Sequence, residues 1–266
     1  MLLAEIHGKT LQAARDSEDY LTSTVFSHLR YVPPHLFWPA FLAAAKGVPG
    51  PGGDETTLLH VLAAGGIDPA KYERLEARFW KSHPTLGEPD LFLLFTGGPQ
   101  PPLVVLVEVK LWSDKSGTGE QDQLVRYLGV LADLGKVVPG VPTEACRYLV
   151  YLTPRESLGE VEDSLASSED PDRERGRLFR FRWQDIVVAA GDALASAPEP
   201  AKTILGDVAR FLRVLGLDYF GGFKRTALPT LPDDLGSFYQ SGSVGFRGFC
   251  RVPGLGFIQI RKGAWA

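Results

Sequence analysis

The sequence predicts an α/β fold in which a central mixed sheet of four strands is flanked by helices. Short apolar runs bounded by turn residues, at 91–95 and 103–109, are typical of buried strands. Segments with a helical apolar period lie before and after them, and such alternation is typical of α/β proteins. The composition agrees, since 44% hydrophobic and 23% charged residues are ordinary for a globular chain of 266 residues.

Apolar spacing and turn signals predict the remaining elements. Helical spacing, with Ser17 as the first N-cap, predicts helices at 18–30, 33–46, 55–64, 69–81, 120–136, 184–195 and 201–215. Short apolar or alternating runs predict strands at 91–95, 103–109, 148–152 and 178–183. The turn at 96–102 joins the first two strands into a hairpin. The polar stretch 160–177 is expected to be a flexible excursion.

The chain is expected to divide into a main domain at 1–216 and a small appendage at 217–266. The last 47 residues hold nine glycines and eight aromatic residues with weak periodicity, which indicates a small β-rich or irregular unit. They carry six basic and two acidic residues, a charge of +4 within a chain of net charge −4, so that residues 1–219 carry −8. The overall charge argues against coating nucleic acid by bulk charge, but a basic tail could help to hold DNA.

The sequence also predicts a cytoplasmic protein that does not enter a membrane. Cys146 and Cys250 are too few for a disulfide framework. Apolar runs such as 103–107 are too short to cross a bilayer. No basic region precedes an apolar segment at the N-terminus, so no signal peptide is expected.

Three charged residues stand at the ends of the predicted hairpin. Glu108 and Lys110 emerge together at the end of an apolar strand, because side chains at i and i+2 share a face. Asp90 begins the preceding strand, and the strand lengths place it beside Glu108. Two adjacent carboxylates repel, and a hard cation such as Mg²⁺ relieves that repulsion. The nearby lysine could orient or deprotonate water, or stabilise charge on phosphate.

The residues Pro89-Asp90 and Glu108-Val109-Lys110, at this spacing, resemble the PD-(D/E)xK nuclease superfamily. Gln123 and Tyr127 resemble the QxxxY motif of its RecB-type branch, and the resemblance covers roughly residues 15–195. It implies a restriction-endonuclease-like core and Mg²⁺-dependent hydrolysis of DNA phosphodiesters, with Mn²⁺ as a substitute ion.

The resemblance also implies roles for individual residues. Asp90, Glu108, the carbonyl of Val109 and Glu18 are expected to bind the metal, and Lys110 is expected to be the catalytic lysine. Gln123 and Tyr127 are expected to position the site or the DNA backbone. Three alternatives stay open, namely Glu88 for Asp90, Asp19 for Glu18 and Gln121 for Gln123, and Glu18 also suits the first turn of a helix in any protein.

Further residues are candidates for contacts with nucleic acid. Lys115 and Ser116 lie in a basic, glycine-containing loop that suits backbone contacts. Trp112 follows the Glu-x-Lys strand and is a candidate for stacking on bases, whereas Trp38, Trp80 and Trp183 are expected to be packing residues. Arg180 and Arg182 could contact phosphate or lie on an exposed strand face balanced by nearby acids.

The function expected from these residues is that of a prokaryotic DNA nuclease in defence, restriction or repair. One active site per chain suggests a homodimer, successive nicks or a larger assembly for double-strand cleavage. The alternatives are a catalytically silent nucleic-acid-binding or scaffold module on the same fold, and a nuclease that acts on RNA.

Overall fold

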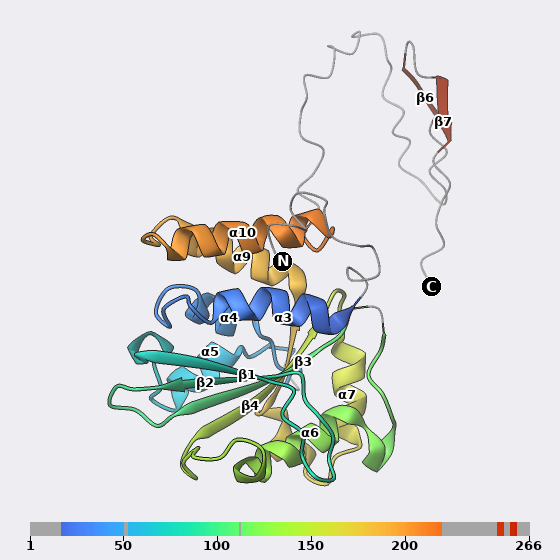
Figure 1. Ribbon diagram of the computed structural model, residues 1–266. Coiled ribbons are helices and arrows are strands. Elements are labelled where there is room, and N and C mark those ends of the chain that lie inside the picture. Colours follow the sequence, from blue (N-terminus) through green and yellow to red (C-terminus); the bar gives the residue numbers. More distant parts are fainter. Residues whose placement is uncertain (1–16, 51–52, 112, 220–248, 253–255, 260–266) are drawn as a thin grey trace. The chain divides into compact units, whose positions relative to one another are not determined.

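A five-stranded mixed sheet forms the centre of the computed structural model, which describes residues 17–50, 53–111, 113–219, 249–252 and 256–259 (Figure 1). The strands are β1 (Arg74–Phe79), β2 (Leu91–Thr96), β3 (Leu103–Val109), β4 (Cys146–Thr153) and β5 (Leu178–Arg182). They lie in the order β1-β2-β3-β4-β5. Strand β2 is antiparallel to both neighbours, whereas β3, β4 and β5 are parallel. The predicted α/β class and mixed sheet are confirmed, with five strands rather than four.

The additional strand, β1, occupies a segment for which a helix was expected. Leu75, Ala77 and Phe79 alternate with polar residues and face the core, so the segment follows a two-residue period. The helical interpretation rested on the spacing of four apolar residues, Tyr72, Leu75, Phe79 and Trp80, which also suits a helix. Strand β1 lies at the sheet edge and hydrogen-bonds along β2, from the Arg74–Thr96 pair to the Phe79–Leu91 pair. That pairing, which a local period cannot reveal, decides the conformation.

Helices cover both faces of the sheet (Figure 1). One layer contains α3 (Glu18–Leu29), α4 (Trp38–Ala44), α5 (Leu58–Ala64), α9 (Trp183–Leu194) and α10 (Ala201–Val214). The opposite layer contains α6 (Gln123–Ala132) and α7 (Leu158–Ala166). The parallel connections β3–β4 and β4–β5 pass through α6 and α7, as parallel strands require crossovers. No helix in the described part of the chain is long and apolar enough to span a membrane.

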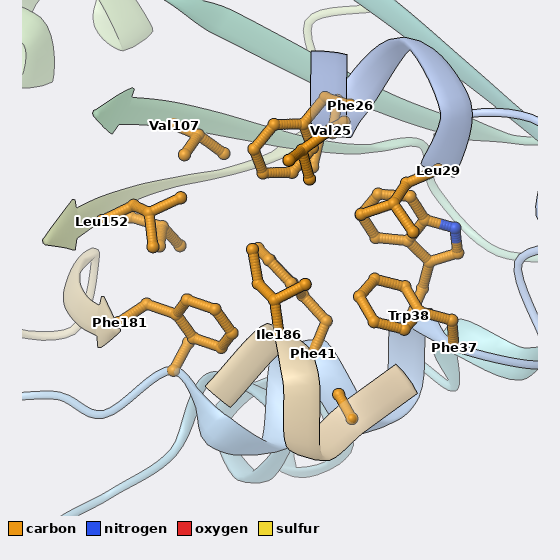
Figure 2. Close-up of a cluster of buried hydrophobic side chains, with 14 of the residues drawn as sticks. Val25, Phe26, Leu29, Phe37, Trp38, Phe41, Val107, Leu152, Phe181 and Ile186 are labelled. Carbon is orange, nitrogen blue, oxygen red and sulfur yellow. The ribbon is translucent and has the colours of Figure 1, made fainter. Parts of the chain in front are cut away.

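Each sheet face has its own hydrophobic core. The larger core contains Val107 and Leu152 from the strands together with Phe26, Phe41 and Phe181, and Figure 2 shows these side chains converging between sheet and helices. The rings of Phe41 and Phe181 lie 4.4 Å apart between centroids. The smaller core takes the alternate strand residues and packs them against α6 and α7. Strands β2 and β3 are therefore covered on both faces, as their continuous apolar runs predict.

Most of the predicted helices are present, although several have different bounds. The side chain of Ser17 caps α3 by accepting the backbone N–H of Tyr20 at 3.2 Å, which confirms the predicted N-cap. The expected helix at 33–46 is shorter because Pro33 and Pro34 precede it and α4 begins at Trp38. The expected helix at 120–136 is limited to α6, with short 3₁₀ turns η2 (Gly119–Gln121) and η3 (Leu134–Lys136) on either side.

The polar stretch 160–177 is not a flexible excursion. It contains most of α7 and all of α8 (Pro171–Arg175). Val161 and Leu165, four residues apart on one face of α7, are buried in the smaller core. The surrounding acidic residues obscured this narrow apolar stripe in the sequence.

By its internal contacts the chain divides into Met1–Tyr219 and Phe220–Ala266. This boundary lies three residues after the expected one at 216. Within the second unit, β6 (Phe249–Val252) and β7 (Gly256–Gln259) form an antiparallel hairpin. The other residues of the expected appendage lie outside the described residues, apart from 217–219.

Candidate active site

The β2–β3 hairpin places Asp90 and Glu108 side by side at one end of the sheet. Leu91 pairs with Val107, so the next residue of each strand continues the same register. The Oδ2 atom of Asp90 accepts the backbone N–H of Val109 at 2.8 Å, which fixes the carboxylate at the end of β3. This is the arrangement that the strand lengths predict. Of the two acids considered, Glu88 lies elsewhere, because its exposed carboxylate accepts the hydroxyl of Ser82.

Glu108 is the most buried acid of the site, with 1% of the residue exposed. Its Oε1 atom accepts hydrogen bonds from Lys110 Nζ at 2.8 Å and from Gln123 Nε2 at 2.7 Å. Its buried Oε2 atom accepts no hydrogen bond from a described donor. Burial, the neighbouring Asp90 charge and a hydrogen bond between the two carboxyl groups raise the pKa of Glu108 to about 8, although Lys110 opposes the shift. A buried carboxylate oxygen without a donor is costly in a fold unless a ligand completes it.

The side chain of Lys110 lies between two acids. Its Nζ atom is 2.8 Å from Glu108 Oε1 and 3.8 Å from Glu18 Oε2, and 12% of the side chain is exposed. Burial opposes the charged amine, but the carboxylates, Glu108 first, raise the pKa of Lys110. The side chain is therefore an ammonium ion in this arrangement.

Glu18 reaches the same site from the first turn of α3. Its Oε1 atom accepts the N–H of Leu111 at 3.1 Å and the hydroxyl of Ser113 at 2.8 Å. Burial acts against ionisation, but these hydrogen bonds and the charge of Lys110 lower the pKa of Glu18. Its alternative, Asp19, is exposed, and its charge is near enough to Asp90 to contribute to the raised pKa of that residue, for which burial is the main cause.

Gln123 and Tyr127 lie at i and i+4 on one face of α6, directed at Glu108. Besides its bond to Glu108, Gln123 donates to the hydroxyl of Tyr127 at 3.3 Å and accepts the N–H of Ser116 at 3.2 Å. The Tyr127 hydroxyl donates to the carbonyl of Glu88 at 3.0 Å, which ties α6 to the loop before β2. Gln121, the alternative to Gln123, is exposed.

The backbone of Lys110 is held from two sides. Its N–H donates to the carbonyl of Leu152 at 2.8 Å, and its carbonyl accepts the indole N–H of Trp183 at 3.1 Å. Trp183 is fully buried at the start of α9. Trp183 was expected to be a packing residue only, but its indole also fixes the backbone of Lys110.

The residues predicted to contact nucleic acid differ in their placement. The Lys115 amine pairs with Asp122 and donates to Ser164 Oγ at 2.9 Å, so its role in binding DNA stays a prediction that this internal pair does not favour. Ser116 is exposed in the loop leading to α6. Trp112 lies outside the described residues.

Arg180 does not form a phosphate-binding strip with Arg182. Its guanidinium donates to the Gly47 carbonyl at 2.6 Å, to Glu156 at 2.6 Å and to Glu55, and only 6% of the residue is exposed. Those acids lie on loops far from β5 in sequence. Both arginines lie on the predicted strand, but their position on it could not reveal these partners.

Two residues near the site, Arg126 and Trp80, were not predicted from the sequence to be functional. Arg126 lies one turn from Gln123 on α6, and its buried Nε atom has no hydrogen-bond partner among the described residues. Its Nη1 atom lies over Gly87, 3.5 Å from where a Cβ would stand. The i, i+3 spacing places Arg126 on the same helix face as Gln123, and this spacing could have indicated from the sequence that Arg126 lies near the site. Trp80, next to Asp90 across the β1–β2 pair, is the second.

The donor set fits a small hard cation that keeps part of its water shell. Among the described residues, no three His, Cys, Asp or Glu side chains form a ready-made metal cluster. Mg²⁺ does not require such a cage, because it commonly binds through one or two carboxylates, waters and substrate phosphate. The adjacent Asp90 and Glu108 carboxylates, with the unpartnered Oε2 of Glu108, meet that requirement.

Comparison of the chain with protein-family models, curated proteins and solved structures found no match. The assignment of a function therefore depends on the chemistry of the site itself.

Proposed function

We propose that the protein is a Mg²⁺-dependent nuclease of the PD-(D/E)xK type that hydrolyses DNA phosphodiester bonds. The observation that carries the proposal is the buried Glu108 carboxylate, which has one unpartnered oxygen and lies beside Asp90 and Lys110. Burying two adjacent carboxylates with a single close cation is unfavourable for a purely structural role. The same geometry is favourable if a divalent cation completes it.

Asp90 and Glu108 are the residues that would hold the cation, with the Val109 carbonyl and Glu18 as the further predicted ligands. A bound Mg²⁺ supplies neutralisation of charge on the scissile phosphate and acidification of a coordinated water. Glu18 already accepts two hydrogen bonds from the segment after Lys110. These bonds favour a positioning role for Glu18.

The chain's own groups have distinct tasks in this proposal. The Lys110 ammonium stabilises negative charge that develops on the phosphate. Gln123 orients Glu108 through its 2.7 Å hydrogen bond, and Tyr127 fixes α6 against the loop before β2. Trp183 holds the backbone of Lys110 in place through its carbonyl. Such supporting contacts typically change the activity of a metal site by about 10–100-fold.

The arrangement of the sheet supports a restriction-endonuclease-like core as part of the proposal. An antiparallel hairpin delivers Asp90 and Glu108, and the following helix α6 delivers Gln123 before the chain enters a parallel strand. The helices on both faces agree with the expected architecture.

The proposal is tested by incubating the purified protein with supercoiled plasmid and Mg²⁺, with EDTA as the control. Nicked or linear DNA is expected with Mg²⁺ and not with EDTA. Parallel reactions with single-stranded DNA and RNA of the same sequence identify the preferred substrate. Metal-independent binding of DNA without cleavage under Mg²⁺ or Mn²⁺ would instead support a silent binding module.

Arg126 is expected to contact a substrate phosphate. In an inactive Glu108→Gln background, Arg126→Ala should weaken DNA binding uniformly across sequences and reduce the slope of log K against log salt by about 1. Arg210→Ala, an exposed arginine on α10 in the opposite helix layer, serves as the matched control and should leave the slope unchanged. Fluorescence anisotropy at several salt concentrations measures both quantities, and equal slopes for the two variants would contradict the role of Arg126.

A further inference from the structure

Trp80 stands directly beside the candidate active site. It follows the last residue of β1, and its backbone N–H donates to the carbonyl of Asp90 at 3.1 Å. Residues opposite each other in an antiparallel pair have Cα atoms roughly 4.5–5.5 Å apart. The tryptophan is thus an immediate neighbour of an expected metal ligand.

The side chain of Trp80 is not part of the core. It is 40% exposed, whereas Trp38 and Trp183 are fully buried. Its ring contacts that of Phe79, with centroids 5.4 Å apart, and no hydrogen bond of its indole is formed with another described residue. Trp80 was expected to be a packing residue, and its 40% exposure corrects that prediction.

The backbone at Trp80 is strained. Its φ of +48° is the only positive value at a non-glycine position in the described chain. A bulky aromatic residue is disfavoured in this region, where glycine would be relaxed. Trp80 thus combines a strained backbone, a backbone hydrogen bond to Asp90 and an exposed apolar ring, and strained residues cluster at ligand contacts.

We propose that the Trp80 indole is a stacking platform for an unpaired nucleobase, and that the substrate is therefore single-stranded DNA or a single-stranded segment beside a duplex. The inference rests on the proposed nuclease function. Stacking on an aromatic side chain requires a free base face. Inside a duplex, neighbouring base pairs cover both faces of each base, so away from the duplex ends a base can meet the indole only where the strand is unpaired.

The test compares binding of a labelled single-stranded oligonucleotide and its blunt duplex to inactive Glu108→Gln protein. Adding Trp80→Gly should weaken single-strand binding by about 10-fold and change duplex binding by less than about 2-fold. Trp80→Phe should keep most of the affinity, because the aromatic face remains. Tyr31→Ala is the control, since Tyr31 is 66% exposed and lies beyond the far end of α3 from Glu18.

Folding is controlled independently, because glycine relieves the positive φ and Trp80→Gly is expected to melt no lower than its parent. Equal losses for single strands and duplex, or no loss for either, would overturn the stacking proposal. The outcome is separable from that of the proposed function. If plasmid or single-stranded DNA is cleaved in a Mg²⁺-dependent way while Trp80→Gly binds normally, only the stacking proposal fails. If binding depends on Trp80 but no DNA is cleaved, the stacking proposal would be supported and the proposed nuclease function would be contradicted.

Discussion

Replacing Glu108 with glutamine is expected to lower DNA cleavage by about 10³-fold, equivalent to about 4 kcal/mol of transition-state stabilisation. Glutamine has the shape of glutamate and keeps an oxygen for the hydrogen bonds from Lys110 and Gln123. It removes the negative charge that the proposed cation requires. Initial rates of plasmid nicking, measured at saturating Mg²⁺, give the ratio.

Glu88→Gln is the matched control for this substitution. Glu88 is exposed, accepts a hydrogen bond from Ser82 and lies two residues from Asp90. We expect the initial cleavage rate of Glu88→Gln to lie within about 3-fold of that of the unmodified protein, since surface changes outside the site have small effects. A large loss in Glu88→Gln with retention in Glu108→Gln would mean that the wrong acid had been assigned.

The stability of Glu108→Gln at different pH values tests the protonation of Glu108 independently of DNA cleavage. The pKa of Glu108 is raised from 4.5 to about 8, so the folded protein binds a proton that the unfolded chain releases at lower pH. Metal-free protein should therefore lose stability as the pH rises from about 4.5 to about 8, and Glu108→Gln should lose less. Urea unfolding at several pH values measures this difference. If the free energy of unfolding changed with pH in the same way in both proteins, the raised pKa of Glu108 would be contradicted.

Replacing Arg180 with methionine is expected to destabilise the fold by about 3 kcal/mol, because it removes the cation from a buried network. The guanidinium ties β5 to Glu55, Glu156 and the Gly47 carbonyl. For a unit of this size the loss corresponds to a decrease in Tm of roughly 6–12 °C. Arg180→Lys should recover only part of the stability, since one amine cannot match three divergent donors.

Arg182→Met provides the control on the same strand. Arg182 is more exposed and pairs with Asp185 at 3.5 Å, so we expect a loss of about 1 kcal/mol or less.

The stability that the Arg180 network provides should depend on pH. Although burial acts in the opposite direction, Arg180 lowers the pKa of Glu55 and of Glu156. The network's contribution is therefore present above pH 4.5 and is lost as the pH falls through the lowered pKa values. Equal Tm values for the two methionine variants would show that the network does not stabilise the fold.

The sequence predicted the hairpin more accurately than its surroundings. The continuous apolar runs of β2 and β3 require cover on both faces, and their lengths place Asp90 beside Glu108. Strand β1 escaped prediction because its apolar residues fit two periods, and only pairing with β2 distinguishes them. Local sequence carries no information about such a partner.

Contacts between distant segments account for the remaining differences at the site. Glu18 accepts the N–H of Leu111 across 93 positions of sequence, so its placement could be suggested only by resemblance. The buried partners of Arg180 come from two separate loops, and an alternating arginine pattern cannot show that they exist. The positive φ of Trp80 could likewise not be predicted, because nothing in the residue type of a tryptophan favours that conformation.

A crystal structure of the protein soaked with Mn²⁺ tests directly whether Asp90 and Glu108 bind a divalent cation. We expect an anomalous peak between Asp90 and Glu108, at about 2.0–2.2 Å from the Oε2 atom of Glu108. Asp90→Asn crystals soaked in the same way should show a weaker peak or none. A fully soaked crystal with Mn²⁺ bound elsewhere, and with no peak within coordinating distance of Glu108, would show that these carboxylates do not form a metal site.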